Sequence, residues 1–290
     1  MSFASILVYV EADPLAEPRL RLAASLANEF DAFLVGVGAE IFEPPNTAAA
    51  FGYVDGETMV AEANVVQHDL RFAEARFTEV AKAVGGGSSW RSGVGLPYEI
   101  VVQQSRAADL IVCGPRNADR WGLHNHADAG DVLMSAGRPL LVTPPDLSKL
   151  DASSIVIAWK DTRESRRAVS DAMPLLKRAS QVLIAEVCET SEEVDAKARC
   201  ADVAEFLARH GVKASTAVRR ADRDSAMAAL LQIADMQDAG LIGRGAMATR
   251  GCANGASAVS RGNSSPARRG RCCLVTSPGV EVFSRLGLFP

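Results

Sequence analysis

The chain has 290 residues, of which 48% are hydrophobic, and a formal net charge of −4, a length that suits two ordinary domains. It contains no apolar run long enough to span a membrane and no basic, apolar leader after Met1, so a cytoplasmic protein is expected. The negative charge gives no reason to expect nucleic acid or an anionic membrane as a partner.

The first half alternates short apolar runs with segments of helical period. Residues 6–10 form an apolar, β-branched run that predicts a strand covered on both faces. Glycines 85–87 end a long helical segment, and Pro97 is placed where a helix begins. This alternation predicts a doubly wound α/β layer, with strands at 6–10, 32–37, 90–92, 110–113 and 139–143 and helices at 18–30, 57–84 and from 97.

Residues 143–148 break this pattern with turn formers, and a second cycle begins at 154–158. Two copies of one domain, packed as an intramolecular pseudo-dimer, follow from a repeat of about 150 residues, because solenoid repeats are far shorter. The boundaries are placed at 1–148, 149–246 and a tail, 247–290. Further strands are expected at 181–187 and 212–218, and helices at 164–177, 192–210 and 224–236.

Three local strings carry a resemblance to a known family. They are IVIAWKDTRESRRAV at 155–169, AADLIVCG at 107–114 and AGRPLLV at 136–142. Over roughly residues 1–242, the chain resembles the universal stress protein family in its tandem two-domain form. The resemblance implies two five-stranded parallel-sheet domains, adenine-nucleotide alpha-hydrolase-like and Rossmann-like. It also implies a bacterial stress-response protein that dimerises and, in one subclass, binds ATP.

In that subclass the phosphates lie on a loop after the fourth strand, which reads Gly, two residues, Gly, nine residues, Gly, then Ser or Thr. Glycines let backbone amides approach a phosphate, and the next helix points its N-terminus at it. The first half departs from this pattern: Asn117 stands at the second glycine position and Asp131 follows Gly130. An aspartate there repels phosphate, so the first domain is interpreted as unable to bind nucleotide.

Two other features of the first half are candidates for a metal site or a reactive thiol. His124 and His126 flank one residue, with Asp128 and Asp131 nearby, but no third ligand of defined geometry is evident, so a solvated loop is favoured over a metal site. Cys113 ends the fourth strand and is expected to be a packing residue, since no partner set is placed to activate it.

The second half holds the candidate nucleotide site. The resemblance implies contacts from Trp159, Lys160 and Asp161 after the first strand, from the backbone near Val218 and from Gly245, with ATP or a related adenine nucleotide as ligand. Lys160 stands where the family usually has its acid, and Asp161 follows one residue later. Asp161 has a second interpretation, as a residue of the helix N-terminus beside the potential cap Thr162.

The tail differs in composition from the rest of the chain. From residue 241 onward there are seven arginines, no lysine, and Glu281 as the one acid. Read one base earlier, codons for residues 247–265 permit Tyr-Gly-His-Ser-Arg-Leu-Arg-Glu-Trp-(Gly/Arg)-Phe-Gly-Gly-Val-Ser-Arg-Glu-Leu-Leu, which with Gly245 restores the phosphate loop of the family. The hypothesis is a one-base insertion or deletion near residues 241–246, which leaves the second domain incomplete, the tail disordered and a sheet edge uncovered. The alternative is a divergent C-terminus with a solvated basic patch at 268–271.

No Ser-His-Asp set or paired carboxylate stands out, so binding to a nucleotide or to unknown protein partners is expected rather than catalysis. Self-association is expected through sheet edges or within the pseudo-dimer. Two alternatives stay open. One is an ATP-hydrolysing or flavoprotein-related α/β enzyme, since related folds host both. The other is a dimerisation module that has lost its ligand site.

Overall fold

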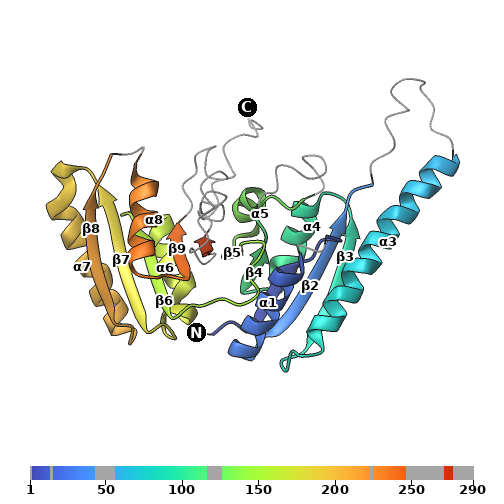
Figure 1. Cartoon of the computed structure of the whole chain (residues 1–290), viewed down its shortest axis with the longest axis horizontal. Coiled ribbons are helices and arrows are strands. Elements are labelled where there is room, and N and C mark those ends of the chain that lie inside the picture. Colours follow the sequence, from blue (N-terminus) through green and yellow to red (C-terminus); the bar gives the residue numbers. More distant parts are fainter. Residues whose placement is uncertain are drawn as a thin grey trace, which may run out of the picture.

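The computed structural model describes residues 2–13, 16–42, 56–115, 126–222, 225–245 and 271–276. Within these ranges, strands and helices alternate through both halves, as predicted (Figure 1). The first half contains β1 (Ser5–Tyr9), α1 (Ala16–Phe30), β2 (Phe33–Glu40), α3 (Gly56–Ala81), β3 (Ser88–Val94), α4 (Pro97–Gln104), the 3-10 turn η1 (Ser105–Ala107), β4 (Leu110–Cys113), α5 (Ala129–Ala136) and β5 (Leu140–Val142). The second half contains β6 (Ser154–Trp159), α6 (Arg163–Leu176), β7 (Gln181–Cys188), η2 (Thr190–Glu192), α7 (Glu193–Arg209), β8 (Ala214–Arg220), α8 (Ala226–Met236), β9 (Leu241–Gly245) and β10 (Cys272–Thr276).

The strands form one ten-stranded sheet with the order β3-β2-β1-β4-β5-β10-β9-β6-β7-β8. Each half contributes five strands, and all neighbours within a half are parallel. The halves meet where β5 pairs antiparallel with β10. The predicted α/β class with two tandem five-stranded parallel domains is therefore confirmed.

Alternating residues of each strand enter two separate cores, one on each face of the sheet. Along β1 and the residue after it, Ile6, Val8 and Val10 belong to one core, whereas Leu7 and Tyr9 belong to the other. The first core also takes the apolar faces of α1, α3, α6 and α7, and the second those of α4, α5 and α8. Helices on both faces explain why the strands are continuous apolar runs.

Predicted element ends agree closely with the observed ones. Pro97 is the first residue of α4, and Gly211 follows α7 with a φ of +81°, a left-handed conformation that glycine adopts without strain. Gly87, after α3, has a φ of +88°. Among the described helices, none is both long and apolar enough to cross a membrane.

The expectation of an uncovered sheet edge after residue 246 is wrong. Cys272–Thr276 form β10, whose five residues are all buried between β9 and β5. The physical reason is that this short run is apolar enough to fill an interior strand position, even though its surroundings are rich in arginine and glycine. Residues 246–270 and 277–290 lie outside the described residues, so the rest of the predicted tail stays a prediction.

The seam between β5 and β10 has local two-fold symmetry. Residues 138–143 read RPLLVT and residues 271–276 read RCCLVT, so Leu141 and Leu274 occupy equivalent positions. Leu274 pairs with Leu141, Val275 with Leu140, and Cys273 with Val142. Equivalent residues thus exchange partners, as in an isologous dimer interface.

Candidate ligand sites at the two switch points of the sheet

The strand order creates two places where the winding of the chain reverses. β1 lies between β2 and β4 in the first half, and β6 lies between β7 and β9 in the second. In open parallel sheets, ligands bind outside the carboxyl ends of the strands at such a switch point. The carboxyl ends of β1 and β4, and those of β6 and β9, are therefore the two candidate ligand positions.

A buried ion pair fills the first switch point. Arg19 of α1 is only 5% exposed, and its Nη2 donates to Oε2 of Glu11, just after β1, at 2.5 Å. The Nε of Arg19 donates to the Tyr9 carbonyl at 3.1 Å. Burial by itself raises the pKa of Glu11, but Arg19 and His126 outweigh it and lower that pKa to about 2. Glu11 is therefore a carboxylate at neutral pH.

His126 binds the second oxygen of the same carboxylate. Its Nδ1 pairs with Oε1 of Glu11, and its Nε2 lies 3.2 Å from the Pro115 carbonyl oxygen. The Glu11 carboxylate therefore lies between the Arg19 guanidinium and the His126 ring.

The space beside Gly114, the residue after β4, is also filled by the chain itself. A Cβ at Gly114 would collide with Nη1 of Arg19. At the start of α5, Asp128 caps the helix and accepts from the amides of Gly130 at 2.7 Å and Asp131 at 3.4 Å. A phosphate needs both the glycine's free surface and free helix amides. The predicted loop position Asn117 lies outside the described residues.

Neither metal nor thiolate chemistry is built into the described part of this site. His126 is engaged by Glu11 and Pro115, His124 lies outside the described residues, and the described ranges contain no group of three or more His, Cys, Asp or Glu side chains arranged to hold a metal ion. Burial raises the pKa of the Cys113 thiol to about 12, against a smaller opposing effect of Arg19. Cys113 is thus a protonated packing residue.

The second switch point carries the predicted residues Trp159, Lys160 and Asp161. Trp159 ends β6 and is 7% exposed, whereas Lys160 and Asp161 are exposed in the turn before α6. Asp161 pairs with Arg166, and Thr162 is the N-cap, accepting from the Ser165 amide at 3.3 Å. The cap interpretation therefore applies to Thr162, and the Asp161 carboxylate lies at the surface.

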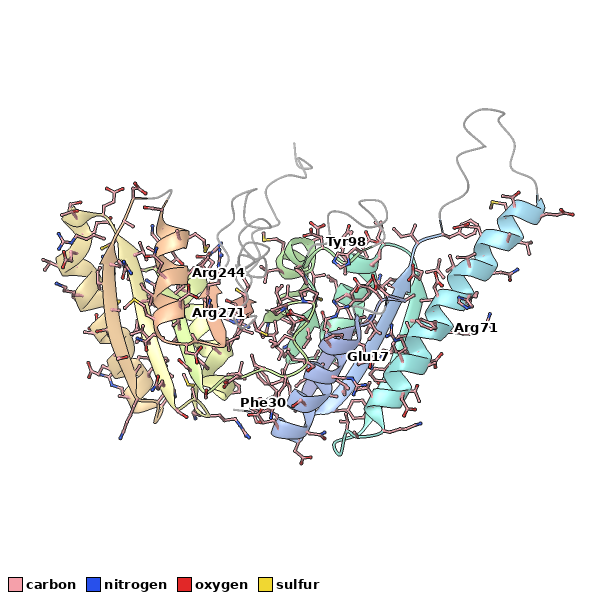
Figure 2. All side chains as sticks on the ribbon, in the orientation of Figure 1. Glu17, Phe30, Arg71, Tyr98, Arg244 and Arg271 are labelled. Atoms are coloured by element: carbon pink, nitrogen blue, oxygen red, sulfur yellow. The ribbon has the colours of Figure 1, made fainter. Side chains whose placement is uncertain are left out.

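Gly245, the last residue of β9, lies beside Trp159, because β9 pairs with β6 in a register that joins Arg244 to Ala158. A Cβ at Gly245 would lie 2.5 Å from the Glu164 carbonyl carbon, so glycine lets the strand approach the first turn of α6. Figure 2 shows Arg244, the preceding residue, beside α8. The structure thus brings the Trp159-to-Asp161 turn and Gly245 together.

Val218 lies two strands away from Trp159, since Trp159 pairs with Glu186 and Glu186 pairs with Val218. At about 4.8 Å per strand, the separation is roughly 10 Å. Between them, Glu186 is 3% exposed and accepts from Arg199 Nη2 of α7 at 2.5 Å. The indole Nε1 of Trp159 is buried without a hydrogen-bond partner among the described residues.

Glu186, which lies on β7 between Trp159 and Val218, was not predicted as a site residue from the sequence. Its signal was present as the one charged residue inside the apolar run Gln181–Cys188. Any ligand placed across the carboxyl ends of β6, β7 and β8 meets this carboxylate, together with the Sγ of Cys200, 3.8 Å from it. The second switch point therefore combines a buried indole donor, a buried carboxylate and an exposed Lys160–Asp161 turn.

No family model matches the sequence, and no curated protein is similar to it. Solved structures do match along almost the whole chain. A universal stress protein from Archaeoglobus fulgidus DSM 4304 superposes with a TM-score of 0.67 at 14% identity, covering 95% of this chain and 96% of that one. Protein PA1789 of unknown function from Pseudomonas aeruginosa PAO1 gives a TM-score of 0.56 at 19% identity, with 95% and 93% covered. The chain therefore has the full-length tandem fold seen in a universal stress protein.

Proposed function

We propose that this chain is a stress-response protein of the universal stress type that binds one adenine nucleotide, at the second switch point. The observation that carries the proposal is the meeting of Trp159, Lys160, Asp161 and Gly245 at the carboxyl ends of neighbouring strands, where the winding reverses. The shared fold supports the assignment to this type of protein.

The side chains at this position suit the nucleoside better than the phosphates. Among the described residues the Trp159 N–H has no hydrogen-bond partner, the Asp161 carboxylate accepts hydroxyl or amine donors, and Glu186 accepts amine donors. The sequence lacks the glycine-spaced phosphate loop in both halves. Adenosine, AMP and ATP are therefore expected to bind with affinities within about threefold of one another, since the sequence offers no such loop to contact the extra phosphates.

Isothermal titration of the full chain with adenosine, AMP and ATP tests this proposal. Asp161→Ala is expected to weaken binding about tenfold, the loss of one charge-assisted hydrogen bond. Asp202→Ala is the matched control, because it removes an exposed carboxylate from α7 far from the strand ends. Absence of heat and of any thermal shift with all three ligands would contradict the proposal, as would an equal loss in both variants.

The frame hypothesis adds a second comparison. A chain in which residues 247–265 are replaced by the alternative reading carries the glycine-spaced loop after β9. That chain is expected to prefer ATP over adenosine at least tenfold, because loop amides then contact the phosphates. No gain in preference for ATP would mean that the alternative reading does not restore a phosphate site.

A further inference from the structure

Among the described residues of the first half, the Glu11–Arg19–His126 network is a largely buried polar group, and the described residues of the second half place no such network at the equivalent positions. Counted from the first residues of β1 and β6, the positions equivalent to Glu11 and Arg19 are Lys160 and Ala168. The fold therefore does not require this network. Its side chains are 17%, 6% and 18% exposed, respectively, so the network lies just beneath the surface at the first switch point.

The donors around Glu11 are arranged as a receptor for a carboxylate. Arg19 approaches one oxygen and the His126 ring the other, so each oxygen has its own partner. Arg19 also contacts the Tyr9 carbonyl, and His126 the Pro115 carbonyl. Both side chains thus stay in place through contacts that do not involve Glu11, which is the condition for a pre-organised anion site.

Neighbouring groups also bear on the charge at this point. The Arg19 guanidinium balances the charge of the Glu11 carboxylate, and the His126 ring contacts the same carboxylate. Glu40 is influenced by Glu11: burial, then Asp69 and Glu11, raise the pKa of Glu40 to about 7. Glu40 is thus partly neutral at pH 7, and the Tyr9 hydroxyl is buried and neutral.

We propose that Arg19 and His126 form an anion-binding site for a small carboxylate, and that Glu11 of the same chain occupies it as an internal ligand. The site is distinct from the nucleotide position in the second half. The internal ligand keeps the first switch point closed to external anions, because the tethered carboxylate competes at a high effective concentration.

Acetate rescue of Glu11→Ala tests the proposal. Removal of the Glu11 side chain leaves Arg19 buried without its carboxylate, which destabilises the fold, and free acetate refills the position. The midpoint of thermal unfolding of Glu11→Ala is expected to rise by about 5 °C or more between about 1 and 100 mM sodium acetate. Wild type is expected to show no such rise, because Glu11 already fills the site.

Glu17→Ala is the matched control. Glu17, labelled on α1 in Figure 2, also accepts from two arginines, Arg21 and Arg76, but its side chain is 39% exposed. Arg21, at 60% exposed, and the Glu17 position itself are open to water, whereas Arg76 is 19% exposed. Acetate is therefore expected to change this variant no more than wild type. The double variant Glu11→Ala/Arg19→Met is expected to lose the acetate response, because the receptor cation is gone.

Three results would overturn the proposal. One is an acetate response of Glu11→Ala no larger than that of Glu17→Ala. Another is a response that persists in Glu11→Ala/Arg19→Met. The third is a Glu11→Ala chain that stays unfolded at every acetate concentration. Because adenine nucleotides are absent from these titrations, their outcome is independent of the nucleotide proposal.

Discussion

The most demanding prediction concerns strand β10, because this strand lies in a segment whose composition predicts no structure. Leu274 is 1% exposed at the centre of the seam, directly opposite Leu141, which is 0% exposed. Leu274→Ala removes three buried carbons, about 2.4 kcal/mol of transfer free energy at about 0.8 kcal/mol each. The cavity that remains adds to this, so a loss of about 2.5–5 kcal/mol is expected.

Urea denaturation of the full chain, followed by circular dichroism, measures this loss. Leu141→Ala is expected to cost a similar amount, because the two leucines are equivalent across the seam. The double variant is expected to fall short of or exceed the sum by about 0.5 kcal/mol or more, as neighbouring residues do. Val194→Ala, at a side chain 80% exposed on α7, is the control and is expected to stay within about 0.5 kcal/mol.

A cost below about 0.5 kcal/mol for Leu274→Ala, together with additivity with Leu141→Ala, would refute the reasoning. Such a result would mean that residues 272–276 do not join the sheet, and that β5 and β9 are not bridged by this strand.

Three further predictions concern the two switch points. Arg19→Met is expected to lower the free energy of unfolding by about 3–5 kcal/mol in urea at pH 7, because the buried Glu11 carboxylate loses its arginine partner. Adding Glu11→Gln is expected to recover most of the loss, and equal stability of the single and double variants would contradict the importance of this ion pair. The pKa of Glu40 is about 7 in the fold against 4.5, so ionisation of this carboxyl lowers the free energy of unfolding as pH rises from about 4.5 to 7. Glu40→Gln is therefore expected to stabilise the fold by about 1–2 kcal/mol at pH 8, after allowance for solvent screening, and to have no effect near pH 4.5. The opposite pH trend would refute the raised pKa. Gly245→Ala is expected to lower the free energy of unfolding by about 1–3 kcal/mol, since the new Cβ meets the backbone of α6. Gly243→Ala in the same strand places a Cβ that meets nothing within 4 Å, so it is the control and is expected to be nearly neutral. Equal losses in the two variants would contradict the close approach of Gly245 to α6.

Local patterns predicted most of the architecture. The β-branched run that became β1 and the helical period that became α1 both appear at the expected positions, since burial on both faces imposes continuous apolar strands. The repeat of this cycle after residue 153 was enough to predict two domains of the same fold. The turn from Trp159 to Asp161 was proposed as a site from the resemblance to the universal stress protein family and not from the period of the elements.

What the sequence did not reveal depends on contacts between distant segments. β10 was missed because a five-residue run flanked by arginine and glycine shows no period of its own, although the RxxLVT repeat with residues 138–143 was a usable signal. Arg19 was missed because its role depends on Glu11 and on His126, more than 100 residues later. Glu186 needed the register with Trp159 and Val218, which only the assembled sheet provides.

The number of adenine nucleotides bound by each chain tests the central claim most directly. The two switch points share one fold, but Glu11, Arg19 and His126 fill the first, whereas at the second the Trp159 donor has no partner within the part of the chain that the structure describes. Equilibrium dialysis of the full chain against radiolabelled ATP measures the stoichiometry at saturation. The account predicts one nucleotide per chain, and a value of two, or no binding at millimolar ATP, would contradict it.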